Sequence, residues 1–282
     1  MAKQELLQAN NMKQILLAIQ FLTMLPVRIR GEVNAGQMAA SAAFFPFAGA
    51  VQSILMTTIA AASMQIFSPE LTAGFVVASA ALINGGLHLD GLSDTFDGIA
   101  VKSSGSREED IRKRLSVMKD SSAGAIGVIA LVLFILLKWQ LLSSLLTGVE
   151  LHTALAFIFL MPVISRWAMV VLMRHSKPAA SSGLGYMFIS NIDQTVVMSS
   201  TLITLGICMF TVLTYAAVAY AFWFIFMLIV IIFSVYVFSR TSVKFFEGRF
   251  GGLTGDHAGA LCEAAELIIL LMVNIWLKLY IL

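Results

Sequence analysis

Three aspartates and a histidine lie close together where an apolar run ends. They are Asp90, Asp94, Asp97 and His88, within the sequence GGLHLDGLSDTFDG at 85–98. In a helix, Asp94 lies about 40° from Asp90 in one direction around the helix axis, and Asp97 lies about 20° from Asp90 in the other direction. The three carboxylates therefore share one face. Each acid would cost roughly 2.5–3.5 kcal/mol at a bilayer centre, and like charges repel. A divalent cation removes both penalties, and carboxylate oxygens suit Mg²⁺, with Mn²⁺ as an alternative.

The same residues have simpler explanations. Aspartate is a common helix cap, and a loop that follows a membrane span is polar by default. His88 could contact a phosphate or a metal, or its ring could be satisfied by a backbone carbonyl at the membrane interface. The spacing DxxxDxxDG indicates a metal site more strongly than any single acid does, and it leaves the ligand set open.

The motif MKDSSAG at 118–124 stands at the entry to another apolar run. Lys119 can contact a phosphate as a point charge, and Asp120 can ligate a metal. Backbone N–H groups at the start of the following helix also favour an anion. A plain helix cap with a flanking charge explains this motif equally well.

A glycine-rich turn, GGLTGDHAGA at 251–260, precedes the last apolar run. Such a turn into a helix can cradle a phosphate, which makes Gly252, Thr254 and Gly255 candidate substrate contacts. Asp256 is a further candidate metal ligand.

Three ionisable residues lie inside apolar segments, where charge is costly. Arg166 either binds an anion, pairs with an acid, or extends its charged end to the membrane surface. Glu263 and Glu266 lie about 60° apart on one helix face, which favours a functional role such as substrate binding. The charged stretch REEDIRKR at 107–114 is expected to be a solvated helix face.

The composition identifies the environment that these groups occupy. The chain has 282 residues, of which 59% are hydrophobic and only 12% charged. Soluble domains carry about 25% charged residues, so we expect an all-α, polytopic integral membrane bundle, with residues 1–282 forming a single catalytic domain. About seven spans of the required length are predicted, with six to eight as the range, at 39–66, 71–90, 123–147, 151–173, 196–214, 217–238 and 258–281.

Details of these spans follow from local sequence. Pro46 and Gly49 predict an interruption of the first span. The run from Val196 to Phe238 holds no charge, which suits a helical hairpin that turns near Tyr215. Residues 1–27 are expected to form an interfacial or partly inserted helix rather than a cleaved signal.

Basic residues favour one side of the predicted membrane. Sixteen of the 18 Lys and Arg residues lie in four places: the N-terminal region, the 91–122 connection, the end of the fourth span with the loop after it, and the 239–257 connection. The two exceptions, Lys138 and Lys278, lie inside predicted spans. The positive-inside rule places that side, with its aspartates, in the cytoplasm, with the N-terminus inside. The net charge of +2 gives no indication of nucleic-acid binding.

The chain resembles the cobalamin synthase family, the adenosylcobinamide-GDP ribazoletransferases of bacteria and archaea. The resemblance runs through most of the chain and is carried by motifs in matching order. They are FLTMLPV (21–27), FFPFAGA (44–50), GGLHLDGLSDTFDG (85–98), RLSVMKDSSAGAIG (114–127), SRWAM (165–169), GLGYMF (183–188) and GGLTGDHAGALCEAAEL (251–267).

The resemblance implies a phosphoryl transfer at the bacterial inner membrane. Adenosylcobinamide-GDP would be joined to α-ribazole, or to its 5′-phosphate, with release of GMP and a requirement for Mg²⁺. A homo-oligomer and association with other corrinoid-pathway enzymes are also expected.

We expect the candidate residues to divide between metal binding and charge neutralisation. Lys119 and Arg166 would neutralise the departing GMP, and Asp94 or Asp97 would take the proton of the ribazole 5′-hydroxyl. The expected substrate contacts are His88, Lys119, Gly252, Thr254, Gly255, Glu263 and Glu266. The expected metal ligands are Asp90, Asp94, Asp97, Asp120 and Asp256.

Two other functions remain open at this stage. DTFDGIAVK at 94–102 approximates the start of the CDP-alcohol phosphotransferase signature, which would require a lipid substrate and release CMP. A cation or proton transporter would use the intramembrane acids, although transporters often show two related halves and no internal repeat is found here.

Overall fold

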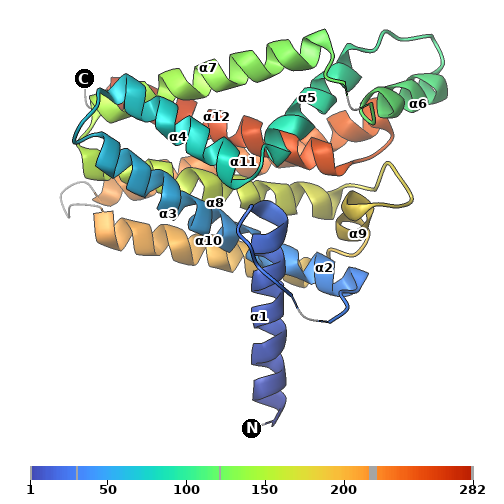
Figure 1. Ribbon diagram of the computed structural model, residues 1–282, viewed down its shortest axis with the longest axis horizontal. Coiled ribbons are helices and arrows are strands. Elements are labelled where there is room, and N and C mark those ends of the chain that lie inside the picture. The colour runs from blue at the N-terminus through green and yellow to red at the C-terminus, as the bar shows by residue number, and fades with distance from the viewer. Residues whose placement is uncertain (1, 30, 121, 216–220, 281–282) are drawn as a thin grey trace.

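The protein is a bundle of long helices, with several short helices gathered at one end (Figure 1). The computed structural model describes residues 2–29, 31–120, 122–215 and 221–280. The helices in this part are α1 (Ala2–Leu22), α2 (Ala35–Ser41), α3 (Phe45–Ser63), α4 (Pro69–Ile83), α5 (Leu87–Ala100), α6 (Arg107–Val117), α7 (Ala125–Gly148), α8 (Leu151–His175), α9 (Leu184–Ile189), α10 (Gln194–Tyr215), α11 (Ala221–Phe250) and α12 (Gly255–Tyr280). A 3₁₀ helix, Ala42–Phe44, joins α2 to α3, and no strand forms among the described residues.

The predicted membrane bundle is confirmed. Within the described residues, six helical segments are long and apolar enough to cross a membrane. Helices α4 and α5, with 15 and 14 residues, are each too short to cross a membrane alone. Together they are long and apolar enough, but they are bent by 88°, so a count of seven includes this pair as one broken span. The predicted interruption of the first span is also present, since the 3₁₀ turn separates α2 from α3 just before Pro46. Helix α1 is not among the candidate spans, and its interfacial placement stays a prediction.

The short helices and polar connections lie together at one end of the bundle. Figure 1 shows α5, α6 and α9 at this end, whereas the C-terminus and the α7–α8 connection lie at the other. The connections that are rich in Lys and Arg are therefore on one side, as the distribution along the sequence predicts.

One sequence-based expectation about this end was wrong. The 239–257 connection is mostly helical, because α11 continues to Phe250 with Val243, Phe246 and Phe250 buried along one face. The hairpin turn predicted near Tyr215 is a separate matter: α10 ends at Tyr215, α11 begins at Ala221, and residues 216–220 lie outside the described part of the chain.

Helix α6 is solvated only in part. Arg107, Arg112 and Lys113 are exposed as predicted, but Asp110 and Arg114 are buried against the end of α11. The Arg114 guanidinium donates to the Arg249 carbonyl at 2.9 Å. Hydrogen bonds from Ser103 and Ser104 lower the pKa of Asp110 to about 2, so this carboxylate remains charged at neutral pH.

Helix α8 forms the centre of the bundle, because 89% of its apolar 18-residue stretch is buried. It contains Pro162, which cannot donate to the helical ladder. Close by, the Ser53 hydroxyl of α3 donates to the Phe159 carbonyl at 2.6 Å. A Cβ at Gly49 of α3 would stand 2.5 Å from the Pro162 carbonyl oxygen. The crossing of α3 and α8 is therefore closer than any side chain at residue 49 would permit.

The bend between α4 and α5 depends on two glycines in the left-handed region. Gly85 has φ 61° and Gly86 has φ 75°, which residues with a Cβ rarely adopt. The Asn84 side chain accepts from the Gly86 N–H at 3.0 Å. This turn directs α5 across the end of the bundle rather than along α4.

Helix α5 is fixed against α7 by a carboxylate. The two oxygens of Asp97 accept from the backbone N–H groups of Gly124, at 2.7 Å, and Gly127, at 2.8 Å. The start of α7 thus receives a charged cap from another helix, which also favours its dipole. A Cβ at Gly127 would stand 2.4 Å from the Ser93 hydroxyl, so only glycine allows this approach.

The α3–α8 crossing predicts the effect of one methyl group. Gly49→Ala should lower the free energy of unfolding by about 1–3 kcal/mol, because the new Cβ meets rigid backbone at Pro162. The thermal unfolding midpoint of the detergent-solubilised protein measures this loss. Gly206→Ala in α10 is the control, since no atom lies within 4 Å of its added Cβ. An equal midpoint for both variants would contradict the crossing.

The cap at Asp97 predicts a local change in backbone protection. Asp97→Asn should cost about 1–3 kcal/mol, because an amide oxygen cannot replace both charged acceptors. Hydrogen exchange at residues 124–128 should accelerate. Asp193→Asn is the matched control, since Asp193 accepts from the Val196 N–H at the start of α10 and should affect only that helix. Unchanged exchange at 124–128 in Asp97→Asn would show that the cap contributes nothing.

Candidate active site

Helices α5 and α12 bring three carboxylates together. A Cβ at Gly91 would stand 2.7 Å from the Asp256 carbonyl oxygen, so the two helices meet in close contact there. The Asp94 carboxylate is partly buried and experiences repulsion from Asp90, Asp256 and, less strongly, Asp97. Asp90 and Asp94 therefore face the start of α12, and Asp256 completes a cluster that we call the carboxylate cluster.

The carboxylate cluster could hold a cation only together with further ligands from outside the protein. Within the described ranges, no three His, Cys, Asp or Glu side chains converge closely enough to form a complete metal site. Mg²⁺ commonly binds one or two carboxylates together with substrate phosphates, and it keeps several waters. Oxygen donors that repel one another are suited to such a partial site.

The other two predicted metal ligands are occupied elsewhere. Both oxygens of Asp97 hold the start of α7. Asp120 is exposed and accepts from the Ser122 N–H at 3.0 Å and from its hydroxyl at 2.7 Å, which lowers the pKa of Asp120. The expected set of five acids is therefore divided: Asp90, Asp94 and Asp256 interact electrostatically with one another, and Asp97 and Asp120 are engaged in local structure.

A pocket of about 750 Å³ opens beside the carboxylate cluster. Its wall includes Lys119, whose ammonium is the one basic group among the lining residues, and Asp256 of the carboxylate cluster. This volume is typical of small-molecule sites. The complete lining is Leu115, Met118, Lys119, Pro178, Ala179, Ala180, Ser181, Ser182, Gly185, Tyr186, Leu253, Thr254, Gly255 and Asp256.

The glycine-rich turn is braced against the loop that forms the opposite wall. Leu253 N–H donates to the Lys177 carbonyl at 2.8 Å, and Ala179 N–H donates to the Leu253 carbonyl at 2.9 Å. A Cβ at Gly252 would stand 2.6 Å from the Ala179 nitrogen. Gly252 thus has a packing role, whereas Thr254 and Gly255 line the pocket.

The first turn of α12 is fixed by a buried histidine. His257 Nδ1 accepts from the Thr254 N–H at 3.0 Å, and the ring packs against Phe246 and Phe250 of α11. The Thr254 hydroxyl lies 3.3 Å from the Asp256 carboxylate. These contacts hold Asp256 at the boundary between the pocket and the carboxylate cluster.

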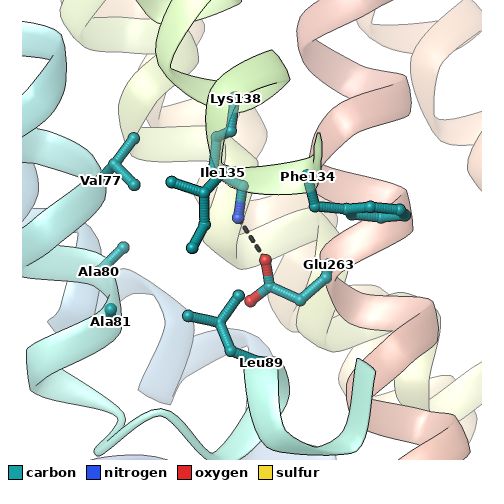
Figure 2. Close-up of a pocket in the computed structure, with 8 residues that line it drawn as sticks. All are labelled: Val77, Ala80, Ala81, Leu89, Phe134, Ile135, Lys138 and Glu263. Carbon is teal, nitrogen blue, oxygen red and sulfur yellow. Dashed lines mark hydrogen bonds and ion pairs between the residues drawn. The ribbon is translucent and has the colours of Figure 1, made fainter. Parts of the chain in front are cut away.

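The remaining predicted residues are buried away from the pocket lining. Arg166 of α8 is 1% exposed and donates to Glu266, to the Gln52 side chain and to His88. Glu263 and Glu266 both accept from Lys138 of α7. Figure 2 shows the Lys138 ammonium pointing at the Glu263 carboxylate, beside a small apolar cavity.

Two features of this region were missed by sequence reasoning. The loop wall at 178–186 overlaps the motif GLGYMF only at 183–186 and is absent from the candidate site residues, although its run of small residues, PAASSG, is typical of a backbone that lines a site. Lys138 was noted only as a basic residue inside a span. A lone lysine in an apolar segment predicts a buried acidic partner, and two glutamates were available.

The chain was compared with known proteins. The family model described as cobalamin-5-phosphate synthase matches residues 14–274. A relative named adenosylcobinamide-GDP ribazoletransferase, from Thermodesulfovibrio yellowstonii, is 34% identical over 92% of this chain and 94% of its own length. Relatives of the same name from Thermoanaerobacter sp. strain X514 (32% identical, 92% and 96% covered) and Clostridioides difficile (31% identical, 93% and 97% covered) are also similar. No solved structure matches.

The family match covers nearly the whole helical bundle, including the carboxylate cluster and both walls of the pocket. The chain therefore belongs to the cobalamin-5-phosphate synthase family and is a transferase.

Proposed function

We propose that this enzyme joins adenosylcobinamide-GDP to α-ribazole, or to α-ribazole 5′-phosphate, and releases GMP. The names of the similar proteins support this substrate pair. The observation that carries the proposal is the position of Asp256, which belongs to both the carboxylate cluster and the wall of the pocket. A diphosphate can then be held at the cluster while the pocket accommodates a second substrate.

The proposed reaction is a phosphoryl transfer. A ribose hydroxyl oxygen of the ribazole bonds to the phosphorus on the corrinoid side of the diphosphate. The bridging P–O bond breaks, and GMP leaves with the bridging oxygen. In α-ribazole 5′-phosphate the 5′ oxygen already carries phosphate, so the attacking group must be another ribose hydroxyl. This chemistry replaces the expected attack by the 5′-hydroxyl.

Each residue near the pocket has a distinct proposed role. Asp90 and Asp256 would hold Mg²⁺, or Mn²⁺, which supplies positive charge to the diphosphate oxygens. Asp94 faces both carboxylates and accepts the hydroxyl proton. Asp97 is unsuited to this role because its two oxygens bind the α7 backbone. Lys119 neutralises the departing phosphate as a point charge.

The buried charged residues are left out of the proposed substrate contacts. Arg166 and Glu266 are 1% exposed, and Glu263 is 3% exposed. Their side chains bind one another, Gln52, His88 and Lys138, and none of them belongs to the pocket lining. Arg166 therefore does not share the charge-neutralising role with Lys119 in this proposal.

The proposed active site faces the cytoplasm of a bacterial inner membrane. The pocket lies at the end of the bundle that carries α6 and α9. The connections at this end contain most of the Lys and Arg residues, and the positive-inside rule assigns such connections to the cytoplasm. Water-soluble nucleotides would then reach the site directly.

The role of Asp94 predicts a loss of turnover without a loss of folding. Asp94→Asn should lower the rate of GMP release by about 10²-fold or more, since a positioned base commonly contributes that factor. The assay supplies adenosylcobinamide-GDP, α-ribazole and Mg²⁺ to purified protein. Glu150→Gln, exposed at the opposite end of the bundle, is the control and should keep full activity. Near-normal turnover in Asp94→Asn would refute the assigned role, and absence of ribazole-dependent GMP release in the unaltered protein would refute the function.

The role of Lys119 predicts a change in substrate affinity. Lys119→Met should raise the KM for adenosylcobinamide-GDP by about 10-fold or more, because a hydrogen bond to a charged phosphate contributes about 1.5–3 kcal/mol. The KM for α-ribazole should change little. Lys113→Met, on an exposed face of α6 outside the pocket lining, should leave both values unchanged. Equal effects of the two substitutions would show that only general surface charge matters.

A further inference from the structure

A closed network of charged and polar side chains lies in the interior of the bundle. Lys138 Nζ lies 2.5 Å from Glu263 Oε2 and 2.7 Å from Glu266 Oε2. Arg166 binds the other oxygen of Glu266 through Nη1, and its Nη2 lies 2.7 Å from Gln52 Oε1 and 3.2 Å from His88 Nδ1. We call this set the buried network: Gln52 of α3, His88 of α5, Lys138 of α7, Arg166 of α8, and Glu263 and Glu266 of α12.

The charges of the buried network cancel. Lys138 and Arg166 supply two positive charges, and Glu263 and Glu266 supply two negative charges. An unpaired charge in a membrane interior is strongly unfavourable, so each of the four groups depends on the others. Loss of Lys138 alone would leave one net negative charge on α12.

Solvent cannot replace a missing partner at Lys138. The cavity beside it measures only about 10 Å³, which is room for roughly one water. Its walls are mostly apolar, with Val77 and Ala80 from α4 and Phe134 from α7 (Figure 2). One water cannot solvate a carboxylate that has lost its cation, so the surrounding helices would have to move.

The buried network reaches the carboxylate cluster through His88. A guanidinium can only donate, so His88 Nδ1 accepts from Arg166 and the ring is neutral with its proton on Nε2. His88 lies in the first turn of α5, two residues before Asp90. A Cβ at Gly259 of α12 would stand 3.2 Å from the His88 Cα, so the same turn packs directly on α12. The position of α5 relative to α12 therefore depends on the network.

We propose that Lys138 is a positioning residue for the transfer reaction. By neutralising Glu263 and Glu266, it holds α5 and α12 so that Asp90, Asp94 and Asp256 keep their spacing. Lys138 is buried and lies outside the pocket lining, so it acts through these partners and not on substrate. The inference rests on the proposed function for its effect on turnover, but its effect on helix spacing is independent of it.

The experiment restores the charge balance by a second substitution in the full-length protein. Lys138→Met leaves the network with one excess negative charge, and Lys138→Met/Glu263→Gln returns it to zero. The single variant should lose about 10–100-fold in kcat for GMP release per folded molecule, with the KM for α-ribazole little changed, because a displacement of about 1 Å costs up to 10²-fold. The double variant should recover to within about 3-fold of the unaltered protein, since removal of both members of a buried pair is often nearly neutral. Lys278→Met, exposed near the end of α12, is the control and should change nothing.

A second measurement does not depend on activity. Nitroxide labels at Ala100→Cys on α5 and Ile275→Cys on α12, both exposed, report the distance between the helices by pulsed electron resonance, and the native Cys208 and Cys262 are buried. The distance distribution should broaden in Lys138→Met and narrow again in the double variant. If the unaltered protein releases no ribazole-dependent GMP, the proposed function fails while these distances still test the positioning role.

Three results would overturn the inference. The first is full activity and an unchanged distance distribution in Lys138→Met. The second is a double variant that folds but remains as inactive as the single variant, which would mean that Lys138 or Glu263 contributes more than its charge. The third is failure of both variants to fold, which would mean that charge balance is not what Lys138 supplies.

Discussion

The ion pair between Arg166 and Glu266 is the constraint on which the rest of the structure depends. It joins α8, the most buried of the candidate spans among the described residues, to α12 in a region where an isolated charge is unfavourable. Glu263, one turn before Glu266 on α12, also requires a positive partner, and Lys138 neutralises it while contacting the second oxygen of Glu266. The remaining donors of Arg166 reach Gln52 on α3 and His88 on α5. The orientation of these helices is thereby fixed by directional contacts that lipid cannot replace.

This constraint explains how like charges can be held together at the end of the bundle. Asp256 of α12 repels Asp90 and Asp94 of α5, so this repulsion would push the two helices apart if they were free to move. Close packing at Gly91 and Gly259 brings the two helices together, and the buried network links them through Glu266, Arg166 and His88. In the proposed function, the electrostatic repulsion within the cluster would favour binding of a cation together with a diphosphate.

Sequence patterns were sufficient for features that depend on local periodicity or polarity. The helical spacing of Asp90 and Asp94 correctly placed them on one face, and the distribution of Lys and Arg correctly grouped the polar connections at one end. The same patterns could not assign partners. Asp97 has the same helical spacing as its neighbours, but two backbone N–H groups that follow it by about thirty residues engage its oxygens. Arg166 and Glu266 lie 100 residues apart, so only the fold could show that they pair.

Charged residues also led to a helix being predicted as a loop at the end of α11, where buried apolar and exposed charged residues alternate. Arg240, Lys244 and Arg249 made the end of α11 look like a loop, although Val243, Phe246 and Phe250 continue its buried face. This extension places Phe246 and Phe250 against His257, and so it helps to fix the first turn of α12.

Because of the bend between α4 and α5, the buried network can set the orientation of α5 as well as stabilise the bundle. A helix that continues straight through the membrane shares one axis along its length, but α5 turns away from α4 by 88°, so the direction of α4 does not set the orientation of α5. Apolar contacts alone are nearly independent of small rotations about the helix axis, whereas a hydrogen bond between Arg166 and His88 is directional. A rotation of α5 by a single residue, about 100°, would turn both aspartates away from Asp256. A charged network in an otherwise apolar interior therefore contributes the rotational setting of α5, which hydrophobic burial of the same residues would leave undefined.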